Sequence, residues 1–460
     1  MKKFLLPILL LLSIRSFAQD TIWHNIDSLM RTAFERGIFN GNVLISNKGK
    51  IIYERSFGFA DGKKETPLNA KHRFDVGSIS KEFNGVAIML LQERGKLSLE
   101  DNLAKFFPEL PVWAATVTVQ NLINYTSGIP VPGLPDGVDD QIIFDSLKDL
   151  RELKAKPGNV YNYSFVDVSI QRRLIEKVSG MSYADFVTKN LLLPAGMTES
   201  VVDYPIDAPL MARAFDAEGN TTSYKAGTKG WLRLPVSDLY RWTQALHSGK
   251  LLSPQSMSIL SRSFPGGESS LGTVVYEGDE MIWHQHQGSN YNYEAAFYTH
   301  LPDDISIVLM TNHQQMKVWP IKTAVLDILY HRPFTIPKKS LYLSIREKML
   351  LDVEKGLSFY HELKVKAQDK YDFSFEIGDL ISTAKYLQRR AKYRSAIKVL
   401  GEAVKLPAKP VDVSYGYELM GGCYLSMNDK VNALKSFHKA LNVNPTNKNA
   451  SNMIHQLSGK

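Results

Sequence analysis

The fold of this chain is decided at residues 73–83, which read Arg73-Phe74-Asp75-Val76-Gly77-Ser78-Ile79-Ser80-Lys81-Glu82-Phe83. A serine and a lysine three positions apart, at the start of an apolar run, place a hydroxyl and an amine on the same face of a helix. Acyl transfer needs this arrangement, because the serine oxygen attacks a carbonyl and a base one turn away accepts its proton. The pattern Ser-x-x-Lys therefore predicts Ser78 as a nucleophile and Lys81 as a candidate base.

The same four-residue pattern occurs elsewhere in the chain, so its surroundings must distinguish Ser78. The other copies are Ser382 to Lys385, Ser395 to Lys398 and Ser436 to Lys439. They lie in a helical C-terminal region, where a serine and a lysine on a solvated face explain the pattern. Ser78 differs because a β-rich segment precedes it and Gly77 allows a tight turn. The apolar run at residues 87–91 then continues as a buried helix.

Several further motifs accompany Ser78 in a fixed order. Two strand-like runs, 41–46 and 50–54, flank Asn47-Lys48-Gly49 and predict a hairpin. The other ordered blocks are Gly58-Phe59-Ala60-Asp61, Gly95-Lys96-Leu97-Ser98-Leu99-Glu100-Asp101 and Leu122-Ile123-Asn124-Tyr125-Thr126-Ser127-Gly128-Ile129-Pro130. In order and spacing, the chain from about residue 38 to about residue 333 closely resembles the class C β-lactamase and D-alanyl-D-alanine carboxypeptidase family. That family of penicillin-binding proteins and serine β-lactamases includes esterases and peptidases, and Ser-x-x-Lys is its catalytic signature.

The resemblance implies an α/β (α+β) β-lactamase-like fold, in which an antiparallel sheet is flanked by helices and joined to a helical lobe. Patterns near the end of the resembling region agree with this fold. The runs 294–298 and 306–310 flank Pro302-Asp303-Asp304 and predict a second hairpin, and Trp319–Tyr330 is amphipathic. The family's site lies between the sheet and the helical lobe.

A tyrosine block follows Pro157-Gly158. In the family this block carries a catalytic tyrosine, then one residue, then an asparagine, and Tyr163 takes the tyrosine position. Beside a lysine ammonium its phenol is expected to have a lowered pKa and to carry protons between the nucleophile and the leaving group. A core aromatic side chain in a tyrosine-rich loop is the alternative, and Tyr161 takes the role if the register shifts by two.

Phe165 departs from the family pattern, since it stands where the asparagine is expected. Phenylalanine cannot form hydrogen bonds, so the pocket loses a donor and an acceptor for a peptide-like acyl group. This departure favours an esterase, or a peptidase with another preference, over β-lactam or D-Ala-D-Ala chemistry. It also leaves an inactive relative open.

His286-Gln287-Gly288 takes the place of the family's third motif, Lys-Thr-Gly or His-x-Gly. By resemblance, His286 supports Tyr163 or binds a substrate carboxylate, and Gly288 lets a substrate approach the strand. The amide of Ser289 would form an oxyanion hole with that of Ser78. His284 shares the strand face with His286 by alternation, but no nearby side chains complete a zinc signature, so we expect neither a metal nor an organic cofactor.

The N-terminus predicts export. Lys2 and Lys3 precede an apolar run at residues 4–12, and Ser16-Phe17-Ala18 offers a cleavage site before Gln19. Residues 1–18 are therefore expected to be a secretory signal peptide, and the protein to be secreted, in a periplasm, without a transmembrane anchor. Cys423 is the only cysteine, which excludes an intramolecular disulfide.

The C-terminal region is basic and repetitive. Residues 337–460 contain 21 basic and 12 acidic residues, a net charge of +9. A tetratricopeptide-like (TPR-like) pattern is formed by Tyr417, Gly421, Tyr424, Ala433, Phe437, Ala440 and Pro445, with a weaker copy at Leu380, Ala384, Ala396, Leu400 and Ala403. The basic surface could meet an acidic partner, a membrane or a cell-wall polymer, but solvated helix faces are the favoured explanation because the lysines are dispersed. No motif indicates nucleic-acid binding.

These observations predict an order of domains and a function. A hydrolase domain spans residues 19–335, a helical connector with one helix at about 343–363 spans 336–375, and TPR-like repeats span 376–460. The chain is expected to be an exported serine hydrolase that forms an acyl-enzyme on Ser78 with a small-molecule, ester, peptide or β-lactam substrate. The sequence does not decide whether Lys81 or Tyr163 is the base. The alternative is a weak or inactive penicillin-binding-like scaffold whose repeats recruit a protein partner.

Overall fold

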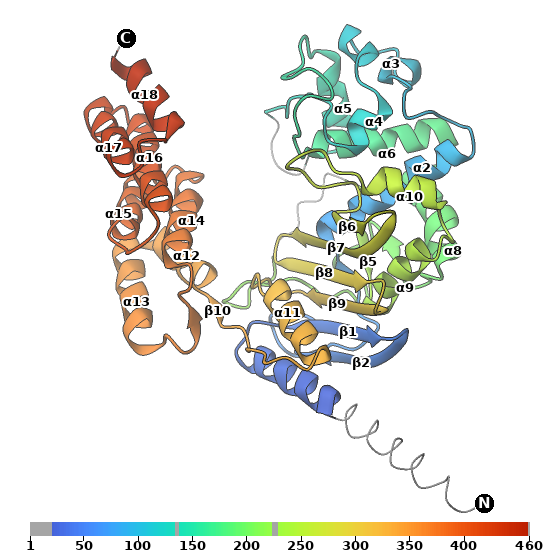
Figure 1. Ribbon diagram of the computed structural model, residues 1–460, viewed down its shortest axis with the longest axis horizontal. Coiled ribbons are helices and arrows are strands. Elements are labelled where there is room, and N and C mark those ends of the chain that lie inside the picture. The colour runs from blue at the N-terminus through green and yellow to red at the C-terminus, as the bar shows by residue number, and fades with distance from the viewer. Residues whose placement is uncertain (1–20, 134–137, 223–228, 459–460) are drawn as a thin grey trace, which may run out of the picture. The chain divides into compact units, whose positions relative to one another are not determined.

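The structure, a computed structural model, describes residues 21–133, 138–222 and 229–458, and the chain divides into two compact units (Figure 1). The first unit extends to Ile336, apart from Arg36–Ile38, and the second comprises those three residues and the chain from Pro337. The predicted signal peptide lies outside the described residues. Within the described ranges, no helix has the length and apolarity needed to cross a membrane.

An antiparallel sheet of six strands forms the centre of the first unit, as predicted. The strand order is β2-β1-β9-β8-β7-β6. The strands are β1 (Gly41–Asn47), β2 (Lys50–Phe57), β6 (Thr273–Glu277), β7 (Glu280–Asn290), β8 (Tyr293–His300) and β9 (Ile305–Thr311). Both expected hairpins are present, as β1–β2 and β8–β9, and β1 pairs with β9. The first and last parts of the unit therefore complete one sheet.

Helices cover both faces of this sheet (Figure 1). A helix at residues 21–35 packs on β2, where the Tyr53 hydroxyl donates to Asp27 (2.9 Å), and α11 (Val318–Leu329) packs on β8 and β9. Alternate residues of β8 and β9 join the core that includes α2 (Ser80–Glu93) and α9 (Val236–His247). Both strands are buried almost throughout, because helices lie on each side of them.

The chain between β2 and β6 builds the helical lobe, which α2 joins to the sheet. Its helices are α3 (Leu103–Phe106), η2 (Val112–Ala115), α4 (Val119–Ile123), α5 (Asp140–Lys148), α6 (Phe165–Ser179), α7 (Tyr183–Val187), η3 (Thr188–Leu192), α8 (Leu193–Ala195) and α10 (Pro254–Ser261). A small sheet orders β3 (Phe74–Asp75), β5 (Leu232–Leu234) and β4 (Val201–Val202) as β3-β5-β4. Strand β3 leads directly into η1 (Gly77–Ile79) and α2, and both helices are largely buried.

The second unit is mostly helical. It contains β10 (Lys339–Ser340), α12 (Leu341–Leu351), α13 (Val353–Lys366), β11 (Tyr371–Asp372), α14 (Glu376–Gln388), α15 (Tyr393–Ala403), α16 (Pro410–Ser426), α17 (Lys430–Val443) and α18 (Lys448–Ser458). The prediction of a single connector helix at about 343–363 is wrong, because two helices, α12 and α13, occupy this region. The chain breaks at Asp352, whose carboxylate caps α13 by accepting from the amides of Glu354 and Lys355. Both helices share a core with α14 and α15.

Candidate active site

The chain turns sharply at Gly77, and this turn presents Ser78 at the start of α2. Gly77 has a φ of +53°, a conformation that favours glycine, and its amide donates to Asp75 Oδ1 (2.9 Å). Asp75 is fully buried and pairs with Arg233 on β5, with 3.2 Å between Oδ2 and Nε. The turn is therefore anchored to the small sheet on the side from which the chain enters α2.

Lys81 contacts the nucleophile directly, since its Nζ lies 3.0 Å from Ser78 Oγ. Burial, with a smaller contribution from the charge of Arg172, lowers the pKa of Lys81 to about 8. A substantial fraction of Lys81 is therefore neutral near pH 8, and only the neutral amine can accept a proton from Ser78.

Tyr163 reaches the same oxygen from the segment before α6, with its hydroxyl 2.9 Å from Ser78 Oγ. Its ring packs on Tyr125 (5.0 Å between centroids), and Lys81 Nζ lies 4.9 Å from the centroid of the Tyr163 ring. Burial raises the pKa of Tyr163, although the hydrogen bond to Ser78 acts in the opposite direction. The expected lowering of this pKa is therefore wrong, because desolvation dominates. The register places Tyr163, not Tyr161, on Ser78.

The other three Ser-x-x-Lys copies lie on α14, α15 and α17 of the second unit. Lys398 on α15 pairs with Glu354, and Ser436 on α17 donates to the carbonyl of Asn432 in its own helix (2.8 Å). These contacts agree with the structural explanation of the copies.

Strand β7 packs its backbone against the Ser78 turn through two glycines. A Cβ at Gly288 would lie 1.9 Å from the carbonyl oxygen of Val76 and 2.7 Å from Ser78 N, and a Cβ at Gly77 would lie 2.5 Å from Ser289 N. The turn that carries Ser78 therefore leaves no room for a side chain at Gly288, and the expectation that a substrate approaches the strand there stays a prediction. The contact brings together the segments that bear the amides of Ser78 and Ser289, as an oxyanion hole requires.

His286 binds a carboxylate that no sequence motif indicated. Its Nδ1 lies 2.7 Å from Glu82 Oε1, and His284 Nε2, on the same strand face as expected, lies 3.3 Å from that oxygen. The contact recorded for His286 is thus with Glu82 and not with Tyr163, while binding of a substrate carboxylate by His286 stays a prediction. Across residues 21–133, 138–222 and 229–458, no group of three or more His, Cys, Asp or Glu side chains could hold a metal ion.

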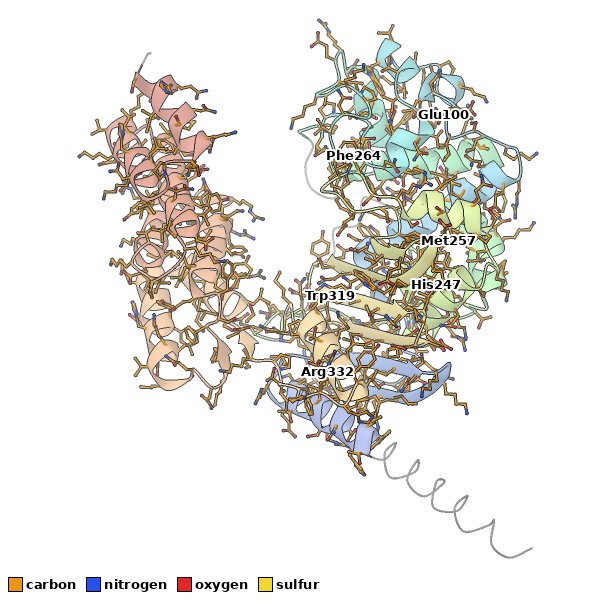
Figure 2. The ribbon with its side chains drawn as sticks, in the orientation of Figure 1. Glu100, His247, Met257, Phe264, Trp319 and Arg332 are labelled. Carbon is orange, nitrogen blue, oxygen red and sulfur yellow. The ribbon has the colours of Figure 1, made fainter. Side chains whose placement is uncertain are left out.

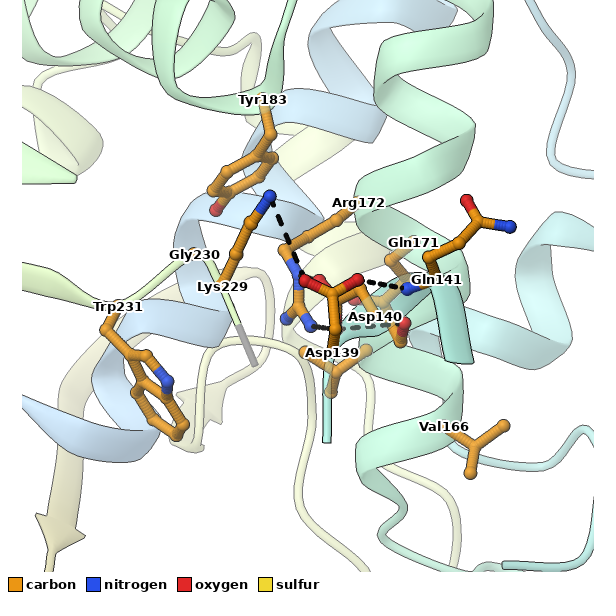
Figure 3. Close-up of polar contacts among 12 residues, drawn as sticks. Asp139, Asp140, Gln141, Val166, Gln171, Arg172, Tyr183, Lys229, Gly230 and Trp231 are labelled. Carbon is orange, nitrogen blue, oxygen red and sulfur yellow. Dashed lines mark hydrogen bonds and ion pairs between the residues drawn. The ribbon is translucent and has the colours of Figure 1, made fainter. Parts of the chain in front are cut away.

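A cavity of about 60 Å³ lies beside Lys81. It is lined by Ser80, Lys81, Asn84, Phe165, Val168, Arg172, Lys229, Gly230 and Trp231. Figure 3 shows the charged side of this region, where Arg172 pairs with Asp140 (2.6 Å) and Lys229 lies 4.0 Å from Asp139. Phe165, in the first turn of α6, is 42% exposed and gives the cavity an aromatic wall in place of an amide.

Two acidic side chains were missed by sequence reasoning. Glu82 follows Lys81 directly, and a carboxylate within an apolar helical run could have marked it as a buried polar group. The sequence did not indicate its partner, because His286 lies 204 positions away. The charge of Glu268 raises the pKa of both Lys81 and Tyr163, against the stronger effect of burial on Lys81. No local pattern marks Glu268, which comes from the loop before β6.

Comparisons with known protein families and proteins show what this chain is similar to. The family model described as Beta-lactamase matches residues 24–328. Penicillin-binding protein 4* of Bacillus subtilis (strain 168) is 26% identical over 358 residues, which cover 68% of this chain and 78% of that protein. The putative penicillin-binding protein PbpX of the same strain is 31% identical over 251 residues, which cover 52% of this chain and 62% of that protein.

Solved structures share the fold at lower identity. EstCE1, described as a hydrolase with promiscuous acyltransferase activity, is 19% identical with a TM-score of 0.57, and the match covers 68% of this chain and all of EstCE1 (100%). A class C β-lactamase is 20% identical with a TM-score of 0.57 and coverage of 68% and 97%. The penicillin-binding protein homologue from Pyrococcus abyssi, described as octameric, is 23% identical with a TM-score of 0.57 and coverage of 71% and 80%.

Proposed function

The chain belongs to the beta-lactamase family, and from that membership we propose that it is a serine hydrolase forming an acyl-enzyme on Ser78. The proposal rests on one observation, which is that two side chains capable of proton transfer both contact the hydroxyl oxygen of Ser78. Lys81 Nζ lies 3.0 Å and the Tyr163 hydroxyl 2.9 Å from Ser78 Oγ. A nucleophile with two proton-transfer groups in hydrogen-bond contact is equipped for both halves of an acyl transfer.

Lys81 is the base in the proposed reaction. Its neutral amine takes the hydroxyl proton while Ser78 Oγ bonds to the substrate carbonyl carbon, and the amides of Ser78 and Ser289 bind the oxygen that becomes negative. Tyr163 passes its proton to the leaving oxygen or nitrogen as that bond breaks, and the Lys81 ammonium returns a proton to the phenolate. Water then adds to the acyl carbonyl, gives a proton to the same pair, and releases the acid product with Ser78 restored.

The cavity beside Lys81 supports an ester substrate with a small, mainly apolar acyl group. Phe165 and Trp231 offer it aromatic surface, and Phe165 supplies no amide to hydrogen bond an acylamino side chain. Amides, D-amino-acid peptides and β-lactams remain substrates of the same chemistry with weaker recognition. The reaction needs no metal and no organic cofactor.

The proposal extends to the whole chain. Residues 1–18 would direct export to a periplasm, residues 19–335 would carry the hydrolase, and 336–375 would connect it to TPR-like repeats at 376–460. The helix pairs α14–α15 and α16–α17 support the repeat assignment. If these repeats bind a protein, the basic charge of this region would suit an acidic partner.

A second candidate is a catalytically weak penicillin-binding-like scaffold, which Phe165 favours. In that case the first unit would bind an acyl compound without turning it over, and the repeats would recruit a partner. The two candidates differ in whether an acyl group is transferred to Ser78 and then released by water.

Intact mass spectrometry after incubation with a fluorophosphonate and, separately, with a penicillin tests the proposal. We expect an adduct with the fluorophosphonate on the wild type and none on Ser78→Ala. Ser395→Ala, in another Ser-x-x-Lys copy, is the matched control and should label like the wild type. A penicillin adduct would extend the substrates to β-lactams. Absence of both adducts from the folded wild type would reject the hydrolase and favour the scaffold.

A further inference from the structure

The loop between α10 and β6, residues 262–272, is held against the helical lobe. Phe264, which is labelled in Figure 2, begins a turn that ends where the amide of Gly267 donates to the Phe264 carbonyl (2.9 Å). Ser270 is buried, and its hydroxyl donates to the carbonyl of Ile123 at the end of α4 (2.7 Å). The backbone between these two points is therefore held in place.

Gly267 and Glu268 contact Tyr161, the tyrosine two positions before Tyr163. A Cβ at Gly267 would lie 2.4 Å from Cδ2 of the Tyr161 ring, so the loop backbone packs directly on that ring. The backbone amide of Glu268 donates a hydrogen bond to Tyr161. The ring of Tyr125 packs between the other two tyrosines, with centroids at 6.1 Å from Tyr161 and 5.0 Å from Tyr163. These contacts bring Glu268 to the side of the site on which the tyrosines lie.

Glu268 adds an unbalanced negative charge to the site. Its charge acts on both Lys81 and Tyr163. The Glu268 side chain is exposed, and no ion pair is recorded for it in the described part of the chain. The other charged side chains that act on Lys81 are each paired with an opposite charge: Arg172 with Asp140 (2.6 Å) and Asp75 with Arg233 (3.2 Å). Lys229, beside the cavity, lies 4.0 Å from Asp139. When Lys81 is neutral, the charge of Glu268 therefore has no counterpart.

A carboxylate near an exposed aromatic ring is complementary to an organic cation. Tyr163 is 41% exposed, so its ring offers surface to a bound molecule. The face of an aromatic ring attracts an ammonium group, and a carboxylate attracts the same group by charge. An alkylammonium group is therefore favoured beside Tyr163, and a carboxylate or phosphate group at that place would be repelled by Glu268.

We propose that Glu268 determines substrate specificity by attracting a positively charged leaving group, so that the preferred substrates are esters of amino alcohols. The cation belongs on the alcohol part because Tyr163 gives its proton to the leaving oxygen. Glu268 is also not among the residues that line the cavity beside Lys81, which would hold the acyl group. The inference rests on the proposed function, since it names the alcohol part of the substrate of that site.

Two thioesters of similar size test this specificity: acetylthiocholine and its uncharged analogue, in which a tert-butyl group replaces the trimethylammonium group. At about pH 8 and low salt, we expect Glu268→Gln to lower the ratio of kcat/KM for the charged over the uncharged compound about fivefold. Glu277→Gln, at the far end of β6, makes the same change in net charge and should leave the ratio unchanged. An unchanged ratio in folded Glu268→Gln, or an equal fall in Glu277→Gln, would overturn the proposal.

Binding to Ser78→Ala separates a failure of this inference from a failure of the proposed function, because this variant cannot be acylated. NMR titration gives Kd for both thioesters. Adding Glu268→Gln should weaken the binding of acetylthiocholine about fivefold and leave that of the uncharged analogue unchanged. Equal effects on the two compounds would overturn the role of Glu268. Wild type that hydrolyses neither compound, while Ser78→Ala keeps the expected difference in binding, would reject the proposed hydrolase alone.

Discussion

Lys81 and Tyr163 both contact the hydroxyl oxygen of Ser78, and burial shifts the pKa of each in a different direction. Desolvation disfavours the charged form of each, so the pKa of Lys81 falls to about 8 while the pKa of Tyr163 rises. The Tyr163 phenol is therefore neutral, and a substantial fraction of Lys81 is neutral near pH 8. A neutral amine is a base and a neutral phenol is an acid, so the pair can move protons in both directions without placing a net charge in the site before reaction.

The pH dependence of the reaction should report Lys81. Because only the neutral amine accepts the Ser78 proton, kcat/KM should rise with pH and level off above a midpoint near pH 8. Steady-state rates with an activated ester across this range measure the midpoint. Lys81→Met should lose about 1,000-fold or more in kcat/KM and the rising limb with it. A midpoint near the ordinary lysine value of 10.5 would contradict a buried base.

Removing the phenolic oxygen of Tyr163 or of Tyr161 should show that only Tyr163 takes part in the reaction. Tyr163→Phe should lower kcat about 100-fold or more, because the leaving group loses its acid and Ser78 Oγ loses a 2.9 Å contact. Tyr161→Phe is the matched control, since its ring also packs on Tyr125 without contacting Ser78, and it should retain most activity. Pre-steady-state kinetics would locate the defect in acylation or in release. Equal losses in both variants would argue against a specific role for Tyr163.

At the residue scale, sequence reasoning named side chains that lie together where local order in the sequence marks them, and their catalytic roles stay predictions. Ser78 and Lys81 stand in one helical turn, and Tyr163 follows a recognisable block, so the structure brings together three side chains that were named from the sequence. Glu82 could not be interpreted in the same way, because its partners are on elements that are distant in sequence. The direction of the Tyr163 pKa shift was missed since it depends on burial, which no motif encodes.

At the level of elements, two glycines let β7 and the Ser78 turn approach backbone to backbone. Gly288→Ala would place a Cβ 1.9 Å from the carbonyl oxygen of Val76, and neither backbone can move without disturbing the other. We expect a loss of about 2 kcal/mol or more in the free energy of unfolding, and loss of acylation. Gly133→Ala is the matched control, since a Cβ at Gly133 would have nothing within 4 Å. Thermal unfolding and fluorophosphonate labelling would check both, and a labelled, fully stable Gly288→Ala would contradict the close contact.

Elements were predicted well where turn residues or alternation mark their limits. Both hairpins and α11 were found because short polar turns separate apolar runs, and because an amphipathic period is visible over Val318–Leu329. The connector was predicted as one helix although it contains two. Asp352 sits within a sequence whose propensity for helix is continuous, and only its capping geometry shows that the chain restarts there.

For the whole molecule, stability should depend on a buried acid that is distinct from the reacting groups. Asp167 on α6 is buried and accepts from Ser127 Oγ through Oδ1 (2.6 Å), and no residue in the described part of the chain hydrogen bonds to its Oδ2. Burial raises the pKa of Asp167 from 3.8 to about 8, against the hydrogen bond from Ser127. The folded state therefore keeps a proton that the unfolded chain releases, and stability falls as the pH rises through this window.

Asp167→Asn should remove that part of the pH dependence. We expect its melting temperature to exceed that of the wild type more at pH 8 than at about pH 5, because only at the higher pH does the wild type hold a buried unbalanced carboxylate. Thermal unfolding at the two pH values measures this difference. An equal difference at both values would show that Asp167 is already ionised in the folded protein at the lower pH.

The backbone contact between β7 and the Ser78 turn has a consequence for how the protein is made. Glu82 and His286 are 204 positions apart, so α2 leaves the ribosome long before the strand that completes its surroundings. Until that strand pairs, the nascent chain has a serine without the second amide that would stabilise an attacked carbonyl. A growing chain should therefore be inert to acylating compounds, and reactivity should arise only when synthesis has passed the end of the sheet.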